Sequence, residues 1–213
     1  MSEPTTAATY PVRFSVDYPD RPLNRLTSAF RIFVAIPILI VLGAVSNSSL
    51  AWSQDGGKAA SGVGGVLFFG PLLMILFRQK YPRWWFDWNV ELQRFTNRVV
   101  VYVLLMDDHY PSTDEQQSVH LDYVYPDVSR DLNRWLPIVK VLLAIPHFIV
   151  LAFLWVAAIV VVIVAWFAIL FTGRYPRGLF DFVEGVMRWG QRVIGYCLLL
   201  TTDKYPPFSL SAS

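Results

Sequence analysis

Histidine, cysteine and carboxylate side chains could do chemistry in this sequence, but their spacing argues against it. His109, His120 and His147 each lack a His, Cys or carboxylate three or four residues further on, where a helix would present a second metal ligand. Cys197 is the only cysteine, and it fits no zinc or redox spacing. No phosphate-binding loop, dinucleotide-binding glycine pattern or nucleophile elbow occurs. We therefore expect no catalytic residue, no cofactor and no metal ion.

His147 stands apart from the other two histidines because it lies in an apolar run directly after Pro146. We interpret it as a helix residue near a membrane interface, or one bonded to a neighbouring carbonyl. The alternative is a proton relay or a ligand contact, since ionisable groups inside a membrane are often functional.

Arginines and tryptophans are the candidates for contact with lipid. A guanidinium can hold a phosphate with two hydrogen bonds, and two similar segments each carry a pair of arginines four residues apart; the alternative is that they face solvent. Tryptophan rings gather at the headgroup level of a bilayer. The candidate residues are Arg94, Arg98, Arg188, Arg192, Trp84, Trp85, Trp88 and Trp189.

Composition places the chain among membrane proteins. Of its 213 residues, 54% are hydrophobic and 16% are charged, and the mean hydropathy is +0.42. Soluble domains carry about 25% charged residues, so this chain lacks the polar side chains to cover itself in water. A net charge of +2 gives no broad basic surface for a nucleic acid, and no nucleic-acid partner is expected.

Three runs without Asp, Glu, Lys or Arg locate the membrane segments: 32–54, 59–77 and 141–173. A spanning helix needs about 20 apolar residues. The first two runs are each one short span, which gives a hairpin over about 26–77. The third run is too long for one ordinary span, so we expect a second, tight hairpin over about 136–172. The alternative is one long tilted helix across 141–173.

Internal repetition supports the second hairpin. Tyr81-Pro82-Arg83 recurs as Tyr175-Pro176-Arg177, and Ala35-Ile36-Pro37 recurs as Ala144-Ile145-Pro146. Fixed-offset self-similarity is typical of duplication. We expect a first repeat over 1–118 and a second over 119–213, related in parallel, with the longer hairpin tip of the first repeat at 47–65. Pro37 and Pro146 are expected to kink the first helix of each hairpin.

An amphipathic helix is expected after each hairpin, over about 84–102 and about 178–197. Apolar residues recur there every three or four positions, which suits a helix lying in the membrane interface or packed on protein. Alternation around Val12–Val16 and Val119–Tyr123, and the apolar runs 99–105 and 195–200, predict a small cytoplasmic sheet. The expected fold is an all-α membrane protein of two hairpins plus interfacial helices and this sheet.

Orientation follows from the basic residues. Eleven Lys or Arg residues flank the hairpin bases, whereas the 47–65 tip carries only Lys58. Because basic residues stay on the cytoplasmic side, we expect a multi-pass protein of the bacterial inner membrane with both termini in the cytoplasm.

The run LAIPHFIVLAFLWVAAIVVVIVAWFAILFTGRYPRGLFDFVEGVMRW, followed by RVIGYCLLLTTDKYPPFSL, resembles a bacterial membrane family defined by a domain of unknown function (DUF4389). The resemblance covers nearly the whole chain, once in each repeat, and is closest over 122–210. It implies an integral membrane protein and names no activity.

Two functions remain open on the sequence. The leading hypothesis is a non-enzymatic accessory or scaffolding subunit of a larger membrane complex, which contacts lipids, other membrane proteins or further copies of itself. The alternative is a small transporter or lipid-handling protein with a polar path near Pro37, Pro146 and His147.

Overall fold

The computed structural model of the chain describes residues 10–45, 70, 72–113, 115–128, 132–133 and 135–212. Its elements follow one another as β1 (Val12–Val16), α1 (Arg25–Ala29), α2 (Arg31–Val45), the π-helix η1 (Met74–Arg78), α4 (Arg83–Val103), β2 (Val119–Tyr123), α6 (Leu136–Leu143), α7 (Ile145–Thr172) and α8 (Arg177–Cys197). The expected tip at 47–65 lies outside the described residues.

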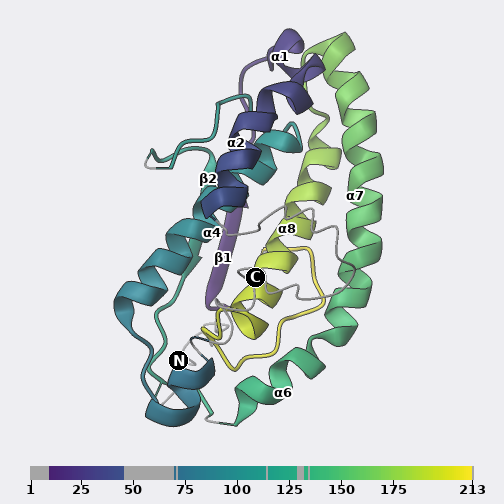
Figure 1. The fold of residues 1–213 in the computed structure, drawn as a ribbon. Coiled ribbons are helices and arrows are strands. Elements are labelled where there is room, and N and C mark those ends of the chain that lie inside the picture. The colour runs from purple at the N-terminus through teal and green to yellow at the C-terminus, as the bar shows by residue number, and fades with distance from the viewer. Residues whose placement is uncertain are drawn as a thin grey trace, which may run out of the picture.

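The described elements form three layers (Figure 1). The sheet packs on α4 and α8, with β1 against α8 and β2 against α4. On their other sides α4 contacts α2, and α8 contacts α7. The central helices are joined through a buried polar contact, in which the Gln191 amide donates to Asn97 Oδ1 at 2.9 Å and Tyr123 donates to Gln191 Oε1 at 2.8 Å. The long outer helices thus lie on one side of α4 and α8, and the sheet lies on the other.

Helices α4 and α8 are central packing helices, which corrects the interfacial position expected for 84–102 and 178–197. Both are 21 residues long and begin after a proline in extended conformation, Pro82 and Pro176. In α4 the apolar stripe packs on α2, where Phe95 and Val99 are buried with Ala35. The corresponding stripe of α8 packs under α7. Protein packing, the alternative reading of these stripes, accounts for their burial.

The second expected hairpin, over 136–172, is wrong. Apart from the short helix α6 at its start, the segment forms one continuous 28-residue helix, α7, about 42 Å long at 1.5 Å per residue. No glycine, proline or polar turn interrupts the run between Phe148 and Phe171, so every backbone group can be satisfied within the helix. Two equivalent hairpins therefore do not occur, and the described residues do not support a fold built from two parallel repeats.

The prolines differ in what they do to the helices. The break lies between α6 and α7, where Ala144 separates them, and Pro146 stands in the first turn of α7, where its missing N–H costs nothing. Figure 1 shows the chain changing direction there. Helix α2, by contrast, continues through Pro37.

The small sheet lies where the alternation predicts it. β1 and β2 pair antiparallel with Phe14 opposite Leu121, and their alternate residues face the helices. The runs 99–105 and 195–200, also expected as strands, are instead the ends of α4 and α8 and the turns that follow. Leu105 and Leu200, at φ 65° and 55°, take the left-handed conformation that ends a helix.

Substitutions at two glycines of α8 test how closely this helix packs against the sheet. A Cβ at Gly195 would lie 2.8 Å from Val12 Cγ2 and 2.9 Å from Tyr123 Cε1, whereas a Cβ at Gly190 meets nothing within 4 Å. We expect Gly195→Ala to destabilise the protein by about 1–3 kcal/mol through overpacking. Gly190→Ala should stabilise it by about 0.5–1 kcal/mol, because alanine is the better helix former. Denaturant titration in detergent measures both; equal effects would contradict this packing.

Candidate functional site

Exposed apolar side chains cover the outer helices α2, α6 and α7. α7 is the one described helix that is long and apolar enough to cross a membrane, and only 17% of its most apolar window is buried. Its buried stripe faces α8 and includes the small residues Ala158 and Ala165. The exposed members of this surface include Ile32, Phe33, Ile40, Leu142, Phe153, Val156, Val160 and Phe171. Soluble monomers rarely expose apolar patches above a few hundred Å², so this apolar surface of α2, α6 and α7 is the most prominent candidate for a binding function.

Arg94 and Arg188 hold the strands against the central helices. Arg188 donates through Nε to the carbonyl of Phe14 and through Nη1 to that of Leu210, both at 2.9 Å, and it pairs with Glu184. Arg94 donates through Nε to the carbonyl of Leu121 at 2.9 Å and also binds Glu91 and Asp122. These two guanidinium groups are therefore occupied by protein.

Arg98 and Arg192 lie one helical turn further along and bind loop carbonyls. Arg98 donates to Ser112 O at 3.0 Å, and Arg192 donates to Ser209 O at 3.1 Å and Ser211 O at 2.7 Å. Arg192 is 1% exposed. The structure thus gives all four candidate arginines contacts within the chain, and a contact with lipid phosphate stays a prediction.

The candidate tryptophans divide between surface and interior. Trp84 and Trp88 are exposed, at 66% and 45%, and Trp85 lies half-buried between them. Trp189 is buried. Trp135, at the start of α6, is exposed and was not among the candidates.

His147 sits in an aromatic cage. Its ring is fully buried and stacks on Phe208 with centroids 4.0 Å apart, beside Tyr205 and Trp189. The Trp189 indole donates to His147 Nδ1 at 3.1 Å, which leaves the ring proton on Nε2. The cage attaches the C-terminal segment to α7 and α8.

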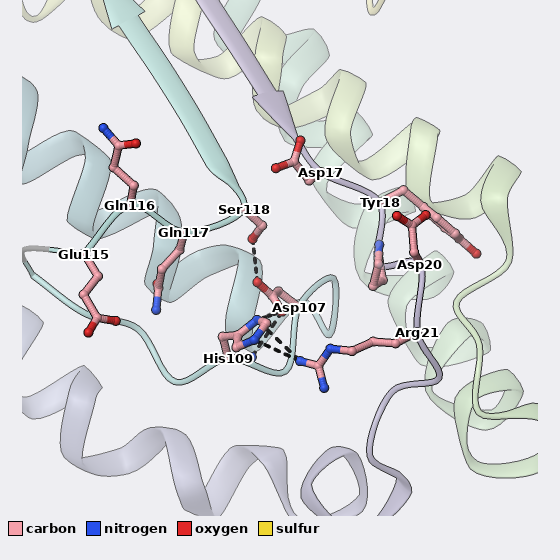
Figure 2. Close-up of a pocket in the computed structure, with 11 residues that line it drawn as sticks. Asp17, Tyr18, Asp20, Arg21, Asp107, His109, Glu115, Gln116, Gln117 and Ser118 are labelled. Atoms are coloured by element: carbon pink, nitrogen blue, oxygen red, sulfur yellow. Dashed lines mark hydrogen bonds and ion pairs between the residues drawn. The ribbon is translucent and has the colours of Figure 1, made fainter.

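A polar pocket of about 520 Å³ lies between the segment that follows β1 and the loop that follows α4 (Figure 2). Its labelled lining residues are Asp17, Tyr18, Asp20, Arg21, Asp107, His109, Glu115, Gln116, Gln117 and Ser118. It brings Asp107, Asp108 and His109 together with Arg21.

Within this pocket Asp107 accepts hydrogen bonds from Ser118, at 2.6 Å, and from His109 Nδ1, at 2.9 Å. Arg21 contacts His109 Nε2 at 3.1 Å and Asp108 at 2.5 Å. Because a guanidinium only donates, Nε2 accepts and the His109 proton is on Nδ1. Burial raises the pKa of Asp107, but the hydrogen bonds from Ser118 and His109 outweigh it and hold the pKa below its usual range.

The geometry of this pocket favours a structural role. The Ser118 hydroxyl donates to Asp107, whose lowered pKa makes this carboxylate a weak base for activating a nucleophile. Potential ligand atoms of Asp107, Asp108 and His109 lie within 4.8 Å of one another, yet Arg21 already supplies the positive charge there. The group ties the loop after α4 to the segment before α1. Helical spacing does not reveal this group in the sequence, because Asp107, Asp108 and His109 are consecutive.

Loss of the Arg188 contacts should destabilise the protein. Arg188→Met leaves the Phe14 and Leu210 carbonyls without this donor and Glu184 without its cation, so we expect a loss of about 2–4 kcal/mol in unfolding free energy. Arg177→Met on the same helix is the control: its side chain is 67% exposed and pairs with Asp181, and solvent screening keeps its effect at about 1 kcal/mol or less. Denaturant titration in detergent compares them, and equal losses would show that Arg188 does not hold the sheet.

Comparison with known proteins adds one finding. Residues 135–209 match the family model described as Domain of unknown function (DUF4389). No curated protein and no solved structure matches the chain. The matched segment covers α6, α7, α8 and the cage around His147, so it contains the long apolar helix. By this match the second half of the chain is similar to DUF4389, in one copy rather than the two tandem copies that the sequence predicted.

Proposed function

We propose that the chain is a non-enzymatic protein of the bacterial cytoplasmic membrane, an accessory or scaffolding subunit that contacts lipids and partner proteins. The observation that carries this proposal is the apolar surface of α2, α6 and α7. Exposure of these side chains to water costs about 25 cal/mol of free energy for each Å² of apolar surface. Hydrocarbon removes that cost. The similarity of 135–209 to a domain of unknown function is compatible with this role and assigns no activity.

The layering supports attachment in the plane of the membrane. α8 and β1 run alongside α7 rather than beyond one of its ends (Figure 1). If α7 crossed the bilayer, the exposed sheet residues Arg13 and Asp122, and Asp17 just after β1, would lie at hydrocarbon depth, where charges are costly. With α7 lying along the cytoplasmic leaflet, the apolar surface meets lipid, the sheet faces water, and both termini stay on one side.

The exposed sheet side would then be the surface for partner proteins. Arg94 and Arg188 already bind outward carbonyls of the two strands, which disfavours partners that add a strand to the edge. We therefore expect partners, including further copies of the chain, to bind through side chains.

Charge placed on the apolar surface should weaken membrane binding. Phe153 and Val160 on α7 are 74% and 57% exposed, and an Asp in hydrocarbon costs about 2.5–3.5 kcal/mol at the bilayer centre. We expect Phe153→Asp with Val160→Asp to lower partition into phosphatidylcholine vesicles at least tenfold in co-flotation. The control, Ser15→Asp with Val124→Asp, changes exposed residues on the sheet side and should bind like the original chain. Equal binding by both variants, with circular dichroism unchanged, would contradict the proposal.

Cysteine labelling tests the in-plane arrangement. Single cysteines replace the exposed residues Trp135 and Arg174, on either side of α7. Cys197 is buried, and burial raises the pKa of its thiol to about 12, so it should stay unlabelled. We expect both new sites to react with a membrane-impermeant reagent only after the cells are opened. Labelling of one site in intact cells would show that α7 crosses the membrane, and labelling of both would place the protein on the outer side.

A further inference from the structure

An apolar cavity of about 360 Å³ lies where the end of α1, the start of α2, the end of α4 and the second half of α7 meet. Pockets for small ligands are typically about 300–1,000 Å³, so this one can take part of a ligand. Its wall includes Val103, Val162, Ile163 and Phe167, and it opens beside exposed side chains of α2 and α7. A chain of methylene groups would suit this wall.

One cation is buried in this cavity. Arg31 is 2% exposed, and Tyr102 is the side chain that chiefly favours its charge; no described residue meets hydrogen-bond geometry at any of its three guanidinium nitrogens. The guanidinium lies 4.0 Å above the ring of Tyr102, which covers one face. The carboxylates of Asp107 and Asp108 act on it electrostatically, but they hydrogen-bond elsewhere, Asp108 to Arg21 and to the Asn24 amide.

A hydroxyl without a partner accompanies this cation. Ser28 lines the same cavity, is fully buried, and its Oγ has no hydrogen-bond partner among the described residues. Buried polar groups are almost always paired, because an unpaired group costs about 1–3 kcal/mol. Two such groups lie in one cavity, and one of them is a cation. This points to an anionic ligand that accepts hydrogen bonds from both.

The second half of the chain shows the same arrangement with its anion present. Lys140 is fully buried and lies over the ring of Tyr196 at 5.1 Å, as Arg31 lies over Tyr102. Lys140 pairs with Asp203 at 2.6 Å and donates to Thr202 O at 2.7 Å. Asp203 accepts the amide of Asn133 just as Asp108 accepts that of Asn24. Asp108, however, turns its other oxygen to Arg21, and Arg31 is left without a carboxylate.

We propose that this cavity binds an anionic membrane phospholipid, whose phosphate is held by Arg31 and Ser28 and whose acyl chain lies along α7. The proposal rests on the membrane attachment proposed above and names a lipid class for it. Guanidinium and hydroxyl groups are suitable donors to phosphate oxygens. The cavity opens beside the apolar surface, so the rest of the acyl chain can stay in the bilayer.

Short-chain lipids test this site apart from membrane attachment. Dihexanoyl phosphatidylglycerol is titrated into the detergent-purified full chain, and binding is counted by native mass spectrometry. We expect one lipid per chain, at least tenfold weaker binding of dihexanoyl phosphatidylcholine and of inorganic phosphate, and at least tenfold weaker phosphatidylglycerol binding by Arg31→Met. Arg31→Lys should recover most of the affinity, and the exposed control Arg174→Met should bind like the original chain.

The outcomes separate this site from a purely structural one. Without lipid, Arg31→Met should unfold at the same temperature as the original chain or higher, because it removes a buried unpaired charge. Arg31→Met should also float with phosphatidylcholine vesicles as the original chain does. If the original chain itself does not float, the proposed membrane attachment is overturned, but the proposed lipid site in the cavity is not. Equal phosphatidylglycerol binding by the original chain and Arg31→Met overturns the site. If inorganic phosphate binds as tightly as phosphatidylglycerol, the proposal that the ligand is a lipid is overturned. If Arg31→Met melts at a lower temperature than the original chain, Arg31 has a structural role and the proposed site is overturned.

Discussion

Hydrogen bonds from two arginines to the outer edges of a two-stranded sheet organise this protein. A pair of strands is marginally stable alone, and its outward backbone groups invite pairing with other chains. Phe14 and Leu121 stand opposite each other, and Arg188 and Arg94 take their carbonyls. Glu184 accepts the Val16 amide and completes the β1 edge. Because these contacts come from α8 and α4, they fix both helices to the sheet and leave the opposite helix faces to α7 and α2.

Local patterns predicted the parts of the fold that local forces decide. Alternation located both strands, and the Tyr-Pro-Arg sites located the starts of α4 and α8, each of which begins directly after an extended proline. The second hairpin failed because an unbroken apolar run is equally compatible with one long helix or two short ones. The choice depends on the partner surface: the stripe through Ala158 and Ala165 matches one uninterrupted side of α8. The sequence also predicted the two amphipathic helices, α4 and α8. It could not show whether their apolar stripes are buried against lipid or against the chain's own α2 and α7.

The candidate site was harder to predict because it depends on contacts between distant residues. Arg94, Arg98, Arg188 and Arg192 were expected to contact lipid phosphate, which stays a prediction. The structure gives each of them a backbone carbonyl as a partner, and such a partner leaves no trace in a sequence. Arg31 and Lys140 look alike as basic residues ahead of apolar helices. What separates them is where two carboxylates point: Asp108 bonds Arg21, whereas Asp203 pairs with Lys140.

The Arg188–Phe14 contact joins residues 174 positions apart, and this has a consequence during synthesis. At about 5–20 residues per second, β1 leaves the ribosome about 10–35 s before α8 can receive it. β2 arrives earlier, but two strands alone do not persist. Helix α2 needs only local hydrogen bonds and forms within about a microsecond, long before the sheet closes. The amino-terminal strand is thus fixed late, although it is among the first segments to be made.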